Sequence, residues 1–130
     1  MYHFTALVTL LAVLVYLYSS ILVSQARAKF GVKLPAISGH PDFERVFRAQ
    51  MNTLEWLPIF LPSLWLFAIY ISDGIAAVIG LVWVIGRILY VFGYAKSVKQ
   101  RGPGFAVQAT ATIALWVGAF GAIVWRLAQA

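Results

Sequence analysis

Four long apolar runs, separated by short polar segments, constrain this chain more than any other feature of its sequence. Hydrophobic residues make up 62% of the 130 residues and charged residues only 11%. A soluble domain averages about 45–50% apolar and about 25% charged residues. The first run, residues 2–23, has about the 20 residues that a helix needs to cross a bilayer. The sequence therefore predicts an all-α membrane protein.

A secretory signal peptide is the main alternative interpretation of the first run. Signal peptides carry a basic segment before the apolar stretch and a small-residue cleavage motif after it. Here no basic residue precedes the run, and the segment SQARAKF, residues 24–30, follows it. We therefore interpret the run as a membrane helix that continues into the headgroup region.

Clusters of Gly, Pro, Ser and Asp divide the rest of the chain. Residues 31–41 contain two Gly, two Pro and one Ser, and form the one substantial loop. Pro58 and Pro62 fall inside the second helix, where a membrane tolerates them and a bend is expected. SDG at 72–74 and RGPG at 101–104 mark tight turns. The sequence predicts one domain, residues 1–130, folded as an antiparallel bundle of four transmembrane helices over about 2–28, 43–71, 74–99 and 104–127.

Basic side chains concentrate in two of the three connections between these helices. The net charge is +6, and the turn at 72–74 carries only Asp73. By the positive-inside rule the basic connections are cytoplasmic and both termini lie on the opposite side, with Arg126 as a minor exception. Such a surplus reports topology and contact with anionic lipid headgroups, so no nucleic-acid partner is expected. The residues are Arg27, Lys29 and Lys33 after the first helix, and Lys96, Lys99 and Arg101 after the third.

Cysteine is absent from the chain. Disulfides, cysteine-ligated zinc and a protein thiol nucleophile are therefore excluded. His3 and His40 have no partners at the spacing of metal ligands, so no metal site is predicted. Any sulfur chemistry must come from a ligand.

A polar stripe runs along the start of the second helix, at the rim of the membrane. Arg48, Asn52 and Glu55 are four and seven residues apart, which places them on one helical face. Ionisable groups at this depth are costly in lipid and should face a protein cleft with a polar ligand. Gln50 falls roughly opposite and would serve a second site, most simply one shared with a neighbouring subunit. Trp56 lies just off the stripe, at interfacial depth.

A second stripe is predicted on the third helix. Arg87, Tyr90, Tyr94 and Arg101 are spaced three, four and seven residues apart, and lead toward the same membrane edge as the first stripe. Arginines such as Arg87 hold carboxylates through paired hydrogen bonds. Arg101, near the interface, is suited to stabilising an anion such as a thiolate. Glu55 can accept hydrogen bonds from an ammonium group. Together the two stripes predict a small zwitterionic or anionic ligand.

Structural roles are the alternative for each residue taken alone. Arg48 and Arg101 could be interfacial anchors, and Glu55 could be neutralised by Arg48 or Arg87 in a purely structural network. Tyr90 and Tyr94 could belong to the aromatic belt. Their convergence at one place favours a binding site.

Both stripes lie within longer runs of specific spacing. FERVFRAQMNTLEWLPIFLPSLW, residues 43–65, follows the pattern ERVxRAQxNxxE, and GRILYVFGYAKSVKQR, residues 86–101, follows RxxYxxGYAxSxxxR. Together they resemble the MAPEG family, membrane-associated proteins in eicosanoid and glutathione metabolism. The likeness is to the branch of leukotriene C synthase and microsomal glutathione S-transferases two and three. It runs from about residue 24 to 101, and the first and fourth helices agree only in hydropathy.

The resemblance implies a homotrimer of four-helix subunits with glutathione bound in a U-shape between neighbours. Arg101 would be catalytic and hold the glutathione sulfur as a thiolate. A hydrophobic electrophile or lipid hydroperoxide would arrive from the bilayer along the subunit interface, past the first and fourth helices. The implied glutathione-binding residues are Arg48, Asn52, Glu55, Tyr90 and Tyr94 of one subunit, with Arg27 and Gln50 of the next; Arg87 and Trp56 complete the candidate set.

Three departures from the leukotriene synthases bear on the activity. Trp56 stands where they have a tyrosine, and Ala28 stands where they have a second arginine. The chain also ends soon after the fourth helix. These differences favour a broad glutathione transferase of a bacterial inner membrane, with the site at the cytoplasmic side and peroxidase activity left open. The host thiol and the physiological electrophile are not encoded in a readable motif.

Two other functions are alternatives to a transferase. A non-catalytic lipid-binding scaffold of the same fold, like the five-lipoxygenase-activating protein, fits poorly with retention of Arg101 and of the whole stripe on the second helix. A small multidrug transporter depends on a glutamate in its first helix, and the first helix here has no acidic residue.

Overall fold

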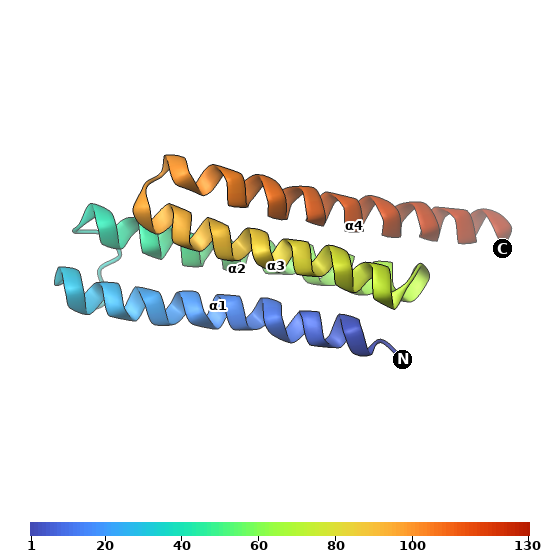
Figure 1. Ribbon diagram of the computed structural model, residues 1–130, viewed down its shortest axis with the longest axis horizontal. Helices are drawn as coiled ribbons and strands as arrows, with labels where there is room; N and C mark the ends of the chain where they lie inside the picture. Colours follow the sequence, from blue (N-terminus) through green and yellow to red (C-terminus); the bar gives the residue numbers. More distant parts are fainter.

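Four long helices and one short 3₁₀ turn account for nearly the whole chain in the computed structural model, which describes residues 1–130 (Figure 1). Each of the four long helices is long and apolar enough to cross a membrane. The predicted all-α architecture is therefore confirmed. The elements are α1 (His3–Phe30), α2 (Pro41–Tyr70), α3 (Asp73–Lys96), η1 (Lys99–Arg101) and α4 (Gly102–Gln129).

The helix ends lie within three residues of the predicted ranges, and the largest difference is at the end of α3. That helix was expected to reach residue 99 and ends at Lys96. Ser97 takes an extended backbone, and its hydroxyl accepts a hydrogen bond from the Gln100 amide at 3.2 Å. A serine side chain that bonds the backbone nearby competes with helix continuation. Arg101 consequently belongs to η1 and not to the face of α3.

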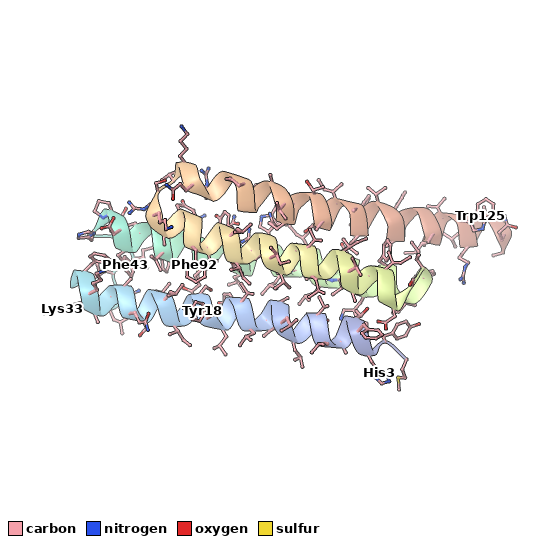
Figure 2. All side chains as sticks on the ribbon, in the orientation of Figure 1. His3, Tyr18, Lys33, Phe43, Phe92 and Trp125 are labelled. Carbon is pink, nitrogen blue, oxygen red and sulfur yellow. The ribbon has the colours of Figure 1, made fainter.

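The two middle helices hold the bundle together. α2 and α3 contact each other and both outer helices, whereas α1 and α4 lie on opposite sides and share no contact (Figure 1). The 31–40 loop and η1 lie at one end, and both termini lie at the other; Lys33 and Phe43 mark the first end, and His3 and Trp125 the second (Figure 2). The connections that carry most of the basic residues thus share one end of the molecule.

Apolar side chains remain exposed along the outer helices. On α1 they recur on one flank, and on α4 they include two aromatic residues that stack on each other, Trp116 and Phe120, with ring centroids 5.1 Å apart. Such exposure is unfavourable in water and is compatible with lipid or with a second subunit. The exposed residues of α1 include Leu7, Leu10, Leu14, Leu17 and Ile21.

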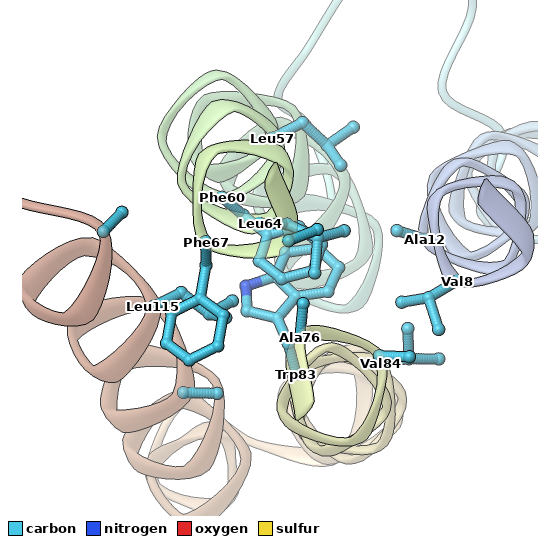
Figure 3. Close-up of a cluster of buried hydrophobic side chains, with 14 residues drawn as sticks. Val8, Ala12, Leu57, Phe60, Leu64, Phe67, Ala76, Trp83, Val84 and Leu115 are labelled. Carbon is cyan, nitrogen blue, oxygen red and sulfur yellow. The ribbon is translucent and has the colours of Figure 1, made fainter. Parts of the chain in front are cut away.

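The core is centred on an aromatic stack between α2 and α3 (Figure 3). The rings of Phe60 and Trp83 are nearly parallel, with centroids 4.0 Å apart, and both side chains are fully buried. Val8 of α1 and Leu115 of α4 close the cluster from either side. This layer joins all four helices at mid-depth.

Two glycines set the distance between α3 and α4. A Cβ on Gly86 would lie 2.7 Å from the backbone nitrogen of Gln108, and a Cβ on Gly104 would lie 2.6 Å from the carbonyl oxygen of Gly86. Neither position has room for a side chain, so the two backbones touch there. The first turn of α4 is thereby held against Tyr90 of α3.

A carboxylate from α3 caps the start of α1. Asp73 accepts hydrogen bonds from the backbone amides of Thr5 at 2.8 Å and of Phe4 at 3.3 Å. The first amides of a helix have no partner within the helix, and the positive end of its dipole favours a negative charge. This contact joins the N-termini of α1 and α3.

We expect Asp73→Ala to lower the thermal unfolding midpoint of the detergent-solubilised protein. Asp73→Asn should lower it less, because the amide oxygen can still accept from Thr5. Scanning calorimetry or a fluorescence melt of the three proteins measures the order. Equal midpoints would show that the cap contributes nothing to stability.

Candidate functional site

A pocket of about 340 Å³ opens between α2, α3 and the first turn of α4, near the end of the bundle at which η1 lies. It contains residues from both predicted stripes, which the fold brings to one place. Two guanidiniums, an amide and two phenols line it, whereas only hydrophobic residues line the groove between α1 and α3. The lining residues are Arg48, Asn52, Tyr90, Tyr94, Arg101, Gly102 and Phe105.

Arg101 reaches this pocket by way of the turn between α3 and α4. Its guanidinium carbon lies 5.6 Å from the ring centroid of Tyr94, and one of its nitrogens donates to the Val98 carbonyl at 2.9 Å. Tyr94 in turn meets the ring of Tyr90 edge-on, with centroids 5.6 Å apart. The exposed Arg101 side chain therefore lines the pocket beside the ring of Tyr94.

Arg48 and Glu55 form a loose ion pair along α2. The charged atoms are 3.9 Å apart, and the two side chains are 52% and 58% exposed. An exposed pair of this kind contributes about 0–1 kcal/mol. Both groups are therefore available to a ligand of opposite charge, with Arg48 in the pocket lining and Glu55 two turns further along the helix.

Arg87 lies behind the pocket and not in its lining. The side chain is fully buried; it donates to Asn52 Oδ1 at 2.7 Å and to Thr53 Oγ1 at 3.1 Å. Its guanidinium carbon also stacks 4.2 Å from the ring centroid of Tyr90. Helical spacing correctly predicts that Arg87 lies on the same face of α3 as Tyr90. Its burial and its hydrogen bonds to two residues of α2 keep it out of the pocket lining.

An aromatic wall closes the apolar side of the pocket. Trp56 meets Phe105 edge-on at 5.5 Å between centroids, and Phe105 lies 6.0 Å from Tyr90. Phe105 and Gly102 were not expected from the sequence. Gly102 is next to Arg101 within the RGPG turn, and Phe105 follows that turn, one helical turn from Arg101; this proximity is the signal that could have identified them.

Two candidate residues lie away from the pocket. Gln50 faces α1 and donates to Ser20 Oγ at 2.7 Å. Arg27 of α1 donates to the Ala36 carbonyl at 2.6 Å and lies 4.8 Å from the ring centroid of Phe43. Neither side chain lines the pocket of its own subunit.

The chemistry of the pocket suits a small ligand with several charges. Two exposed guanidiniums can hold carboxylate or thiolate groups, a carboxylate can accept from an ammonium, and an amide and two phenols can donate hydrogen bonds. The aromatic wall offers an apolar surface beside them.

Comparison with known proteins places the chain in a defined group. The sequence matches the model of the MAPEG family over residues 5–121. An uncharacterized protein of Synechocystis is 52% identical over 124 residues, which is 95% of this chain and 90% of that protein. Leukotriene C4 synthase of Rattus norvegicus is 42% identical, covering 92% of this chain and 80% of the enzyme. Microsomal glutathione S-transferase 2 of Homo sapiens is 42% identical, covering 79% and 70%.

We expect Thr53→Val to destabilise the protein by about 1–3 kcal/mol, because it removes a hydrogen-bond acceptor from a buried charged group. Thr110→Val is the matched control: Thr110 is exposed on α4, and its hydroxyl bonds only the Ala106 carbonyl of its own helix. Reversible unfolding in mixed micelles measures both variants. A loss no larger than that of the control would mean that Arg87 does not depend on Thr53.

Proposed function

This chain belongs to the MAPEG family, and from that membership we propose that it is a membrane-bound glutathione S-transferase. It would conjugate glutathione to hydrophobic electrophiles, and glutathione would supply the sulfur that the chain lacks. The observation that carries the proposal is the pocket in which Arg48, Asn52, Tyr90, Tyr94 and Arg101 meet. The names of the rat and human relatives support the same class of reaction.

The groups of the pocket match the groups of glutathione. Arg48 would bind a carboxylate, and Glu55 would accept from the ammonium group. Asn52 would donate through its amide nitrogen, and the phenols of Tyr90 and Tyr94 would donate or stack. Binding would break the weak Arg48–Glu55 pair and replace it with two ligand contacts, at little cost to the protein.

Arg101 would be the catalytic residue. Its permanent charge in the lining of the pocket would favour the thiolate over the thiol, and the thiol proton would pass to solvent. The thiolate would then attack the electrophilic carbon, forming the sulfur–carbon bond as the leaving group departs with its electron pair. Peroxidase activity toward lipid hydroperoxides would use the same thiolate with a different second substrate.

We further propose that the working unit is a homotrimer whose sites lie between subunits. Arg27 and Gln50 face away from the pocket of their own subunit, and α1 and α4 carry exposed apolar flanks that a neighbour could cover. Arg27 and Gln50 would complete the glutathione site of the adjacent subunit. The electrophile would enter from the bilayer along that junction, where an apolar path selects weakly among substrates.

The pocket would face the cytoplasm. It lies at the end of the bundle where most basic residues gather, which the positive-inside rule assigns to the cytoplasmic side. The similarity to a Synechocystis protein supports a bacterial host, and the inner membrane is then the expected location. Glutathione, a cytosolic thiol, would reach the site directly from that side.

We expect Arg101→Ala to lower kcat for conjugation of glutathione to chlorodinitrobenzene by about 100-fold, with little change in glutathione affinity, because the arginine acts on a charge that develops in the reaction. Arg126→Ala is the matched control, since Arg126 lies 5.8 Å from the ring centroid of Tyr70 at the opposite end of the bundle. The assay uses detergent-purified protein, with glutathione binding measured by calorimetry.

Two results would contradict this assignment at different levels. Equal losses in affinity and kcat would move Arg101 from catalysis to binding. A wild-type protein that binds no glutathione would overturn the proposed function itself.

Shared sites predict complementation between two inactive variants. Arg48→Ala and Gln50→Ala should each lower activity alone. When the two are co-expressed and subunits mix at random, about a quarter of the sites carry both wild-type residues. Activity of the mixed preparation should then exceed that of either parent at equal protein. No recovery would show that each site lies within one subunit.

A further inference from the structure

Arg87 is a buried charge without a counter-charge. The side chain has no exposed surface, and no carboxylate lies within 4.0 Å of it. Its Nε has no hydrogen-bond partner. Taking an unpaired ion out of water costs several kcal/mol even after relaxation. A structural role alone would be served more favourably by an apolar residue.

Each contact of Arg87 leads toward the candidate pocket. Asn52 accepts from Arg87 through Oδ1, which fixes the amide plane and leaves its Nδ2 without a protein acceptor. The Tyr90 ring centroid lies 4.2 Å from the guanidinium carbon of Arg87, and Tyr90 also lines the pocket. Arg87 therefore orients two pocket residues without entering the pocket.

The charges around the pocket are unbalanced within one subunit. Arg48 and Arg101 line it, Arg87 lies directly behind it, and Glu55 is the nearby acid. Three guanidiniums against one carboxylate leave two positive charges. Glutathione carries a net charge of about −1 as the thiol and about −2 as the thiolate, from two carboxylates, one ammonium and the sulfur. Each positive charge at the site, that of Arg87 included, favours the more negative thiolate form over the thiol form.

We propose that Arg87 is a positioning residue of the glutathione site that also favours the thiolate form of the bound ligand. The inference rests on the proposed function. Arg87 fixes the orientations of Asn52 and Tyr90, which contact the ligand. Its positive charge acts on the ligand sulfur through a buried environment that screens charges weakly. Arg101 holds the sulfur directly, whereas Arg87 makes the electrostatic potential at the buried side of the pocket more positive.

Two substitutions at Arg87 separate charge from geometry. Arg87→Gln keeps a hydrogen-bond donor for Asn52 and removes the charge, whereas Arg87→Lys keeps the charge with a poorer fit. The ultraviolet absorbance of the thiolate, titrated with pH on glutathione-saturated protein, gives the midpoint of thiol ionisation. We expect Arg87→Gln to raise that midpoint by about one pH unit. Arg87→Lys should leave it near the wild-type value while raising KM for glutathione.

Two substitutions at Asn52 test the same idea without removing the arginine. Asn52→Asp is nearly isosteric and places a carboxylate against Arg87, so it should raise the midpoint as Arg87→Gln does. Asn52→Ala keeps the uncompensated charge and should weaken glutathione binding without moving the midpoint. These variants keep the test decisive if Arg87→Gln fails to fold.

The outcomes distinguish this inference from the proposed function. A wild-type protein that gives a thiolate signal, with midpoints unchanged in Arg87→Gln and Asn52→Asp, would overturn the inference and leave the function standing. Equal shifts in Arg87→Lys and Arg87→Gln would also overturn it, because charge would not be the cause. A wild-type protein without glutathione binding would overturn both.

Discussion

The structure depends on one constraint: polar side chains within a membrane-spanning bundle must find partners inside the protein. Most hydroxyls bond a carbonyl of their own helix, as Thr9, Thr53 and Thr112 do. The side-chain bonds that cross between helices are fewer, and apart from the contacts of Asp73 with the start of α1 they all involve α2. Trp65 donates to Thr9 and Gln50 donates to Ser20, both on α1, and Arg87 of α3 donates to Asn52 and Thr53. The polar contacts therefore make α2 the helix that sets the register of its neighbours.

The same constraint explains how much of the fold the sequence predicts. Helix number and approximate bounds follow from apolar run length and Gly–Pro clusters, because the bilayer demands whole helices of a set length. The stripe of Arg48, Asn52 and Glu55 follows from helical spacing alone. The end of α3 could not be predicted from the apolar pattern, because it depends on one local hydrogen bond from the Gln100 amide to the Ser97 hydroxyl. The trimer stays a prediction, since it concerns surfaces between subunits.

The site was predicted in part, and the reasons differ between residues. Arg101 lies beside Tyr94 as expected, but η1 places it there and not the face of α3. Periodicity gives the face on which Arg87 lies but not its depth, which is set by Thr53 and Asn52 on the facing helix. Phe105 was missed because a lone aromatic in an apolar helix carries no signal until its neighbours across the turn are known.

The position of the pocket gives a physical reason for its combination of groups. In the proposed reaction the thiolate nucleophile needs charge and water nearby to form, whereas the hydrophobic electrophile is concentrated in the bilayer. The lining changes over one helical turn from the guanidinium of Arg101 to the ring of Phe105, which Trp56 supports from α2. The thiolate and the electrophile can meet at low free-energy cost only at such a boundary. A thiolate moved into lipid, or an apolar electrophile moved into water, would lose its full transfer free energy. The uncompensated charge of Arg87, whose side chain is fully buried, extends the polar side of that boundary into the bundle.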